Sequence, residues 1–270
     1  MIGALIAGAA VAGAAFSARW NWWRPRTRGI PSLMYHKIGD SPKGSRLQKL
    51  WVTTADFRGQ LEYLRAEGWT SMLFRELAEA SDGKRAMPEK PVLITFDDGY
   101  ANNYEEAFPL LKEFGMKGNI FLVYETMERH NAWHDPATEP WLSMLTWAQI
   151  HEMQNSGLVE FGSHTMRHRN LPQISLEDAG WEIRESKLRL EEALGRPMTG
   201  FAYPYGAGAY VPEVRALVRE AGYRYDFGIK QGISPLPWDP ASGPLRRLLI
   251  RGDDTRLDFH INMTRGRSRF

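Results

Sequence analysis

The chain has 270 residues, 43% of them hydrophobic and 24% charged, so wholesale disorder is excluded and a sizeable core can form. It contains no cysteine, which excludes disulfides, thiolate metal sites and a cysteine nucleophile. Residues 1–28 hold four of the 34 lysines and arginines and none of the 32 acidic residues, which leaves the body with a net charge of −2. Nucleic-acid binding needs a basic face on the folded part, so we expect no nucleic-acid partner.

The first eighteen residues carry no charged side chain and would span about 27 Å as a helix, close to the thickness of a bilayer core. Residues 19–24 add arginine and tryptophan, which suit the headgroup zone. We therefore predict an N-terminal apolar helix and membrane anchor, with its basic-aromatic collar, over residues 1–28 and a folded domain over 29–270. A cleaved secretory signal and a buried helix are the alternatives, although no basic residue precedes the apolar run as a signal normally requires.

From residue 29 onward, short apolar runs alternate with longer segments of helical period. Strands are predicted at residues 32–35, 92–96, 119–123, 159–162, 200–203, 224–228 and 247–250. Helices are predicted at residues 55–66 with Thr54 as the cap, 102–114, 147–155, 175–194 and 211–221. About seven strands separated by helices favour a parallel β/α barrel, complete or partial. Residues 125–145 lack a clear period, and we predict an inserted loop that forms one wall of a cleft.

Two adjacent acids, Asp97 and Asp98, follow the predicted strand at residues 92–96 directly. Consecutive strand side chains point to opposite sides, so the two carboxylates can serve different partners. The carboxyl end of a strand is also where β/α folds place their active sites. An ordinary Asp-Asp-Gly turn is the alternative interpretation.

Two histidines, His164 and His168, follow another predicted strand and are four residues apart. This spacing lets both imidazoles face one metal ion, although the pattern alone is also compatible with a solvated polar loop. Two histidines and a carboxylate form a known catalytic metal set with open positions for water and substrate.

A third segment, Tyr203-Pro-Tyr205-Gly206, has the residues of a turn at a strand end and leaves Tyr205 projecting. The other histidines, at positions 130, 134, 151 and 260, belong to no motif, and we expect solvated or packing roles for them.

Taken in order, Thr95-Phe-Asp-Asp-Gly99, Ser163-His-Thr-Met-Arg-His168 and Tyr203-Pro-Tyr-Gly206 resemble the motifs of the carbohydrate esterase family 4 polysaccharide deacetylases, the NodB-homology domain. The resemblance covers roughly residues 31–250. It implies a distorted (β/α) barrel and metal-dependent removal of acetyl groups from sugars. By the same resemblance Asp97 is the general base, and Asp98, His164 and His168 bind the metal. Tyr205 would supply a backbone N–H to the oxyanion.

Two departures from that family pattern stand out. The third motif commonly has Arg two residues before the Pro, where this chain has Ala202, and the final motif lacks its His. His36 follows the first predicted strand, as in the biofilm poly-N-acetylglucosamine deacetylases, so we assign it as the candidate general acid. Arg247 is the candidate substitute that orients Asp97; surface roles are the alternatives for both.

We therefore expect a deacetylase that acts on N-acetylated, or O-acetylated, amino sugars of a polysaccharide or glycolipid. Its cofactor would be one divalent ion, with Zn²⁺ expected and Ni²⁺, Co²⁺ or Mn²⁺ as alternatives. The rival hypotheses are a carbohydrate-binding pseudoenzyme on the same fold and a deformylase-like metal hydrolase of a lipid-linked sugar. The sequence leaves the oligomeric state open.

The side of the membrane is indicated by two opposing arguments. Arginines after the apolar run favour a body on the cytoplasmic face, since positive flanks resist translocation. The resemblance favours the periplasmic or extracellular side, where most such deacetylases meet their polymers. A lipid-linked or nascent glycan at the inner leaflet would reconcile the two, and we expect the cytoplasmic face.

Overall fold

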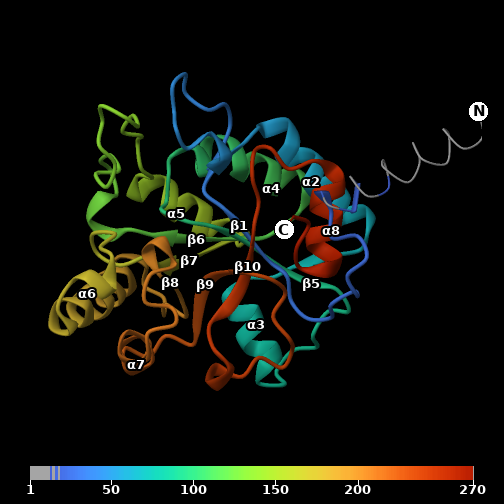
Figure 1. Cartoon of the computed structure of the whole chain (residues 1–270). Coiled ribbons are helices and arrows are strands. Elements are labelled where there is room, and N and C mark those ends of the chain that lie inside the picture. Colours follow the sequence, from blue (N-terminus) through green and yellow to red (C-terminus); the bar gives the residue numbers. More distant parts are fainter. Residues whose placement is uncertain (1–12, 14–15, 18, 270) are drawn as a thin grey trace, which may run out of the picture.

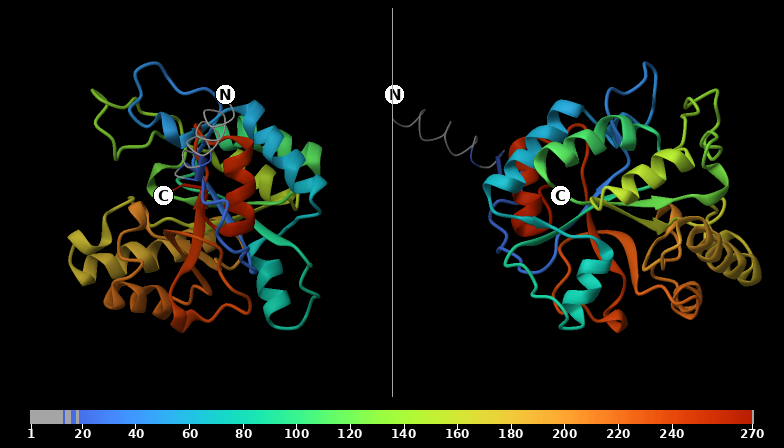
Figure 2. Two further views of the ribbon diagram at one scale, coloured as in Figure 1. Left: turned by 45° about the vertical axis from the view of Figure 1, so that its right-hand side comes forward. Right: turned by 180° about the vertical axis from the view of Figure 1, so that it is seen from behind.

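The computed structural model describes residues 13, 16–17 and 19–269, in which seven parallel strands close into a barrel surrounded by helices (Figures 1 and 2). The order is β1, β10, β9, β8, β7, β6 and β5, and β5 pairs with β1 to complete the circle. The strands are β1 Ser32–Tyr35, β5 Pro91–Phe96, β6 Gly118–Leu122, β7 Val159–Ser163, β8 Gly200–Ala202, β9 Tyr225–Gln231 and β10 Leu245–Leu249. The predicted seven-stranded β/α barrel is confirmed, with small shifts at the strand ends.

The lower part of the barrel interior is filled by aromatic rings. Phe121 of β6 and Phe227 of β9 lie on strands that are not neighbours, yet their ring centroids are 5.3 Å apart, so they meet across the barrel. Phe74 contacts both rings at 5.3 and 5.2 Å. All three are fully buried, and such aromatic contacts add to the large area that each ring removes from water. We call these three residues the aromatic floor.

The alternation of strand side chains then determines what lies above this floor. In β10, Leu245 packs with the aromatic floor and Arg247, two residues on, also points inward because side chains of a strand alternate. Leu249 follows at the cleft above. Leu93 of β5 likewise packs in the lower core, and Asp97, which directly follows β5, lines the cleft. Along β5 and β10 the inward-facing side chains therefore change from apolar, at Leu93 and Leu245, to charged, at Asp97 and Arg247.

Helices cover the outside of the barrel. They are α2 Thr54–Ala66, α3 Phe74–Ser81, α4 Phe108–Phe114, α5 Trp147–Asn155, α6 Leu176–Leu194, α7 Pro212–Glu220 and α8 Arg256–Arg265. Thr146 and Ser175 cap α5 and α6, since each side chain accepts a backbone N–H three residues on. The predicted cap Thr54 is wrong: Thr53 accepts the N–H of Asp56, so α2 begins one residue earlier.

The helix predicted at residues 102–114 is divided into a π-helix, Asn103–Ala107, and α4. The N–H of Phe108 bonds to the carbonyl of Asn103, five residues back. Pro109 has no N–H to donate, so the regular four-residue ladder is interrupted at this point.

Several short elements were not predicted. They are α3, α8 and the strands β2 Lys37–Ile38, β3 Trp51–Val52 and β4 Thr70–Ser71. Strands of two residues are too short for a period to be visible, and α8 has no regular apolar stripe in its sequence. The helix α8 lies beside α2 (Figure 1), where Tyr63 and Phe259 have ring centroids 5.4 Å apart.

Two loops project from the same side of the barrel (Figure 1). One follows β2, and the other is the predicted inserted loop at residues 125–145. The second loop is tied down by bridges between Tyr100 and Met144 and between His130 and Ser143. Leu47 and Leu50 of the first loop and Trp133 of the second line the same cleft, which confirms the predicted wall.

The segment at residues 19–27 packs against α8 and the residues that follow it at the C-terminal end of the chain. Arg19 pairs with Asp258 of α8 at 3.0 Å, and the N–H of Asn21 donates to the carbonyl of Ser268 at 2.8 Å. Within the described residues no helix is long and apolar enough to cross a membrane. The apolar stretch predicted as an anchor lies almost entirely outside the described residues, so the anchor, its orientation and the boundary at residue 28 stay predictions.

Candidate active site

The predicted site residues come together at the carboxyl ends of the barrel strands. A cleft of about 530 Å³ is lined there by Asp97 and Asp98 after β5, by the two histidines that follow β7, and by Tyr205 after β8. His36, after β1, lines the same cleft. The three motifs, which are far apart in the sequence, thus contribute residues to one cleft.

Asp97 and Arg247 form an ion pair inside the barrel. The Nη1 and Nη2 atoms of Arg247 donate to the two carboxylate oxygens at 2.5 and 2.8 Å, and its Nε donates to the carbonyl of Gly228 at 3.0 Å. Arg247 is fully buried and Asp97 nearly so. Burial alone would raise the pKa of Asp97, but Arg247, together with His164 and His36, outweighs this effect, and the pKa is lowered. Asp97 is therefore held ionised and in one orientation.

Asp98 faces away from that pair, toward the two histidines. Its Oδ1 lies 3.4 Å from Nε2 of His164 and 3.2 Å from Nε2 of His168. Burial alone would raise the pKa of Asp98, yet the neighbouring imidazoles, His168 first, lower it. The two adjacent carboxylates thus serve different partners, as predicted. The cause differs from the expected strand alternation, because β5 ends at Phe96 and Asp98 is turned by a backbone φ of 79°.

Asp98, His164 and His168 could hold a metal ion. All three are buried, and one ligand atom from each lies within 4.8 Å of the others. Nδ1 of His164 is 2.7 Å from the carbonyl of Ala202 and donates to it, which directs the lone pair of Nε2 into the cleft. Burial lowers the pKa of His164 to about 4, so the ring is neutral, as a ligand must be. Two imidazoles and one carboxylate fit a catalytic transition metal with open positions.

The loop between the two histidines is held by Glu182 of α6, which the sequence did not single out. Its buried carboxylate accepts the backbone N–H groups of Met166 and Arg167 at 3.0 and 2.9 Å. Thr165 Oγ1 accepts the N–H of His168 at 3.0 Å. The backbone is strained here, since Thr165 and His168 have φ values of 71° and 58°. A carboxylate aimed at two N–H groups stabilises this strained turn.

Aromatic rings enclose His168. Trp133 stacks on the imidazole at a centroid distance of 4.2 Å, and Tyr205 meets it edge-on at 4.6 Å. Tyr205 has a φ of 58° and a half-exposed ring at the mouth of the cleft. Trp133 was not predicted as a site residue, although the high tryptophan content of the loop at residues 125–145 was the available signal. His134, expected to be solvated or packed, also lines the cleft.

His36 lies beside Asp97 in the cleft. Its Nε2 is 4.0 Å from Oδ2 of Asp97. Burial lowers the pKa of His36, while the carboxylates of Asp97 and Asp98 act in the opposite direction. The next residue, Lys37, is fully buried with its Nζ 4.8 Å from the centre of the Tyr100 ring. This cation beside the cleft could not be predicted, since a lysine in a two-residue strand carries no signal.

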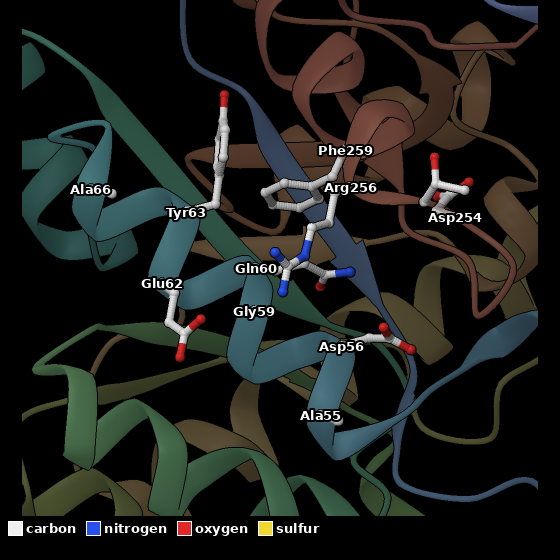
Figure 3. Close-up of a pocket in the computed structure, with 11 residues that line it drawn as sticks. Ala55, Asp56, Gly59, Gln60, Glu62, Tyr63, Ala66, Asp254, Arg256 and Phe259 are labelled. Atoms are coloured by element: carbon white, nitrogen blue, oxygen red, sulfur yellow. The ribbon is translucent and has the colours of Figure 1, made fainter.

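A second cavity, of about 310 Å³, lies between α2 and α8 (Figure 3). Gly59, Tyr63, Arg256 and Phe259 are among its lining residues. Within the described residues it contains no cluster of metal ligands, whereas the cleft above the barrel does. We therefore assign the active site to the cleft.

A parallel seven-stranded barrel with an acid pair and two histidines at its mouth defines the NodB-homology class of α/β proteins. Comparison with known families agrees: residues 84–225 match the family described as polysaccharide deacetylase. The chain belongs to the polysaccharide deacetylase family, and the family expected from the three motifs is confirmed.

Individual relatives are moderately similar. YxkH of Bacillus subtilis is 29% identical over 196 residues, which cover 72% of this chain and 62% of YxkH. Poly-beta-1,6-N-acetyl-D-glucosamine N-deacetylase of Escherichia coli is 29% identical over 147 residues, 51% of this chain and 20% of that protein. The crystal structure of BC0361, a polysaccharide deacetylase from Bacillus cereus, superposes with a TM-score of 0.74 at 26% identity, covering 87% of this chain and 69% of that one. The chain thus spans less than two thirds of both sequence relatives.

The first prediction concerns the metal cluster. His164→Ala should abolish stoichiometric binding of a divalent metal, because it removes one of three ligands, while the fold remains. Metal content after dialysis and the circular dichroism spectrum measure the two effects. His151→Ala, an exposed position on α5, is the control and should bind as the unaltered chain does. Undiminished stoichiometric binding by His164→Ala would show that the ligands lie elsewhere.

The second prediction concerns the buried ion pair. Arg247→Met should lower the free energy of unfolding by about 3–5 kcal/mol, because it leaves the carboxylate of Asp97 buried and unpaired. The double variant Arg247→Met with Asp97→Asn should recover much of that loss, since the orphaned charge is gone. Denaturant titration measures both. Arg58→Met, which breaks an exposed pair with Glu113, should cost far less. Simple additivity of the two buried substitutions would contradict the prediction.

Proposed function

We propose that this chain is a metal-dependent deacetylase that removes N-acetyl groups, and O-acetyl groups where present, from amino sugars of a polysaccharide or glycolipid. The observation that carries the proposal is the juxtaposition of an ionised, Arg-held carboxylate, Asp97, with the cluster of Asp98, His164 and His168 in one cleft. The E. coli relative named as an N-deacetylase of poly-beta-1,6-N-acetyl-D-glucosamine supports this class of substrate. Residues 29–270 would form the catalytic domain, and residues 1–28 the membrane anchor.

We propose that Asp98, His164 and His168 hold one divalent ion, Zn²⁺ in preference to Ni²⁺, Co²⁺ or Mn²⁺. Imidazole with one carboxylate suits zinc in sites that keep positions open for water and substrate. When bound, such an ion supplies Lewis acidity to the acetyl carbonyl and lowers the pKa of water in the site.

Asp97 is the proposed general base. Its pKa is lowered, so it is ionised at neutral pH, and Arg247 fixes the plane of its carboxylate. In the reaction it takes a proton from the attacking water, whose oxygen bonds to the acetyl carbon. The backbone N–H of Tyr205, at the rim of the cleft, would donate to the oxygen that becomes negative. Arg247 acts through Asp97 and is a positioning residue.

His36 is the proposed general acid. When the carbon–nitrogen bond breaks, acetate forms and the departing amine needs a proton. Burial lowers the pKa of His36, which makes its imidazolium a stronger donor, and the carboxylate of Asp97 at 4.0 Å favours its protonated form. The final motif of the family lacks its histidine in this chain, so His36 fills that role.

Acetate release from a panel of N-acetylated oligosaccharides and glycolipids, with and without a chelator, tests the proposed function. We expect release that the chelator suppresses and that added Zn²⁺ restores. Binding of the oligosaccharides without any release would instead favour a carbohydrate-binding protein. Release of formate from N-formylated sugars alone would favour a deformylase.

The third prediction separates the base from the metal ligand. Asp97→Asn should lower turnover by about 10²–10⁴-fold, the usual effect of removing a general base, while the bound metal is retained. Acetate release and metal content are measured on the same preparation, with Asp239→Asn, an exposed position in the loop before β10, as the control. Loss of the metal together with substantial residual turnover would reverse the roles of Asp97 and Asp98.

The fourth prediction concerns His36. His36→Ala should slow the hydrolysis of N-acetyl sugars far more than that of activated aryl acetates, because an aryl oxide leaves without protonation. The ratio of kcat/KM for the two substrates in the variant and the unaltered chain is the measurement. Equal losses on both substrates would indicate a structural role for His36.

A further inference from the structure

A second groove, of about 670 Å³, adjoins the active-site cleft. Trp133, His168 and Tyr205 line both the groove and the cleft, so the two are continuous at the metal cluster. Its other lining residues come from the segments 125–132 and 167–173, which follow β6 and β7. A sugar chain whose acetyl group lies at Asp98 can therefore extend into this groove.

The charge of the groove is strongly positive. Arg129, Arg167 and Arg169 line it, and Glu125 is the one acidic residue in its lining. Glu125 is already occupied, since both its carboxylate oxygens accept from Nε of Arg167, at 2.9 and 2.8 Å. Within the part of the chain that the structure describes, neither Arg129 nor Arg169 has a carboxylate within ion-pair distance. Two exposed guanidinium groups thus remain without a counter-charge.

This concentration of charge differs from the rest of the body, which carries two more acidic than basic residues from position 29 onward. Like charges in a concave site raise the local potential and attract anions. A guanidinium presents paired N–H donors that match the two oxygens of a carboxylate or a phosphate. Thr126, Asn170 and Gln173 add neutral groups that can bond to sugar hydroxyls.

We propose that this groove binds an anionic group, a carboxylate or a phosphate, that the substrate carries beside the acetylated sugar, through Arg129 and Arg169. The inference rests on the proposed deacetylase function and narrows its substrate class to an anionic glycan. A neutral polymer of N-acetylglucosamine leaves both guanidinium groups without a partner.

Three N-acetylated tetrasaccharides of equal length test the proposal: a neutral N-acetylglucosamine tetramer, an alternating tetramer of N-acetylglucosamine and glucuronate, and the neutral tetramer carrying one phosphate. We expect kcat/KM for acetate release to be about tenfold higher for one or both anionic substrates, mainly through a lower KM. The preference should fall as salt is added, because exposed charges are screened. The carboxylate and phosphate arms identify which oxyanion the groove prefers.

Paired variants with the same change in charge locate the effect. Arg129→Gln with Arg169→Gln should bring the ratio of anionic to neutral kcat/KM close to one. Arg196→Gln with Arg219→Gln removes two exposed arginines that precede β8 and β9, at the opposite end of the barrel, and should leave the ratio unchanged. An equal loss of preference in both pairs would overturn the assignment to the groove.

Calorimetric titration of the same three tetrasaccharides into the full chain separates failure of this proposal from failure of the proposed function. Tighter binding of an anionic tetrasaccharide that the groove variants lose supports the site even if no acetate is released. Acetate release with equal efficiency from all three substrates, together with equal affinities, overturns the anionic class while the deacetylase function stands.

Discussion

The ion pair between Arg247 and Asp97 is the constraint on which the rest of the site depends. Arg247 belongs to β10 and Asp97 follows β5, and both strands flank β1, so the pair crosses the barrel interior instead of joining neighbours. The attraction between the two buried charges is largely offset by the cost of removing them from water, so the pair adds little to the net free energy of unfolding. Removing one partner is strongly destabilising, because the other charge is then buried without a partner. Its value lies in holding one carboxylate ionised and immobile beneath the cleft.

Backbone strain is concentrated around the same pair. Within the described residues, five non-glycine positions have a positive φ, and four of them adjoin the cleft: Asp98, Thr165, His168 and Tyr205. Each such position costs on the order of 1–3 kcal/mol and persists only where the surroundings impose it. Here the buried carboxylate of Glu182, the stacked ring of Trp133 and the strands themselves impose it. The strain turns Asp98 toward the histidines directly after Asp97 has turned toward Arg247.

Much of this arrangement was predictable from the sequence. Short segments rich in apolar residues, separated by segments of helical period, were sufficient to find all seven barrel strands. The acid pair and the two histidines, His164 and His168, could be found because the spacing of residues within a motif is visible in the sequence without knowledge of the fold. Arg247 could be named as a partner of Asp97 only through the missing arginine at Ala202, and the structure places the two in contact.

Other features could not be predicted, for physical reasons. Glu182 contacts the histidine loop from the middle of α6, and a glutamate on an amphipathic helix looks like any exposed one until the helix is docked. The burial of Lys37 depends on Tyr100 and Trp51, which lie far away in the sequence. Phe74 belongs to the aromatic floor only because α3 places it beneath strands that are themselves not adjacent.

The aromatic floor has a consequence for turnover. Close-packed side chains fill the barrel below Arg247, so the mouth of the cleft is the route by which both substrate and products exchange. Acetate formed at the histidine cluster would lie beneath the sugar from which it was cut. Besides the mouth, the adjoining groove that shares Trp133, His168 and Tyr205 with the cleft would offer the acetate a way out past the sugar.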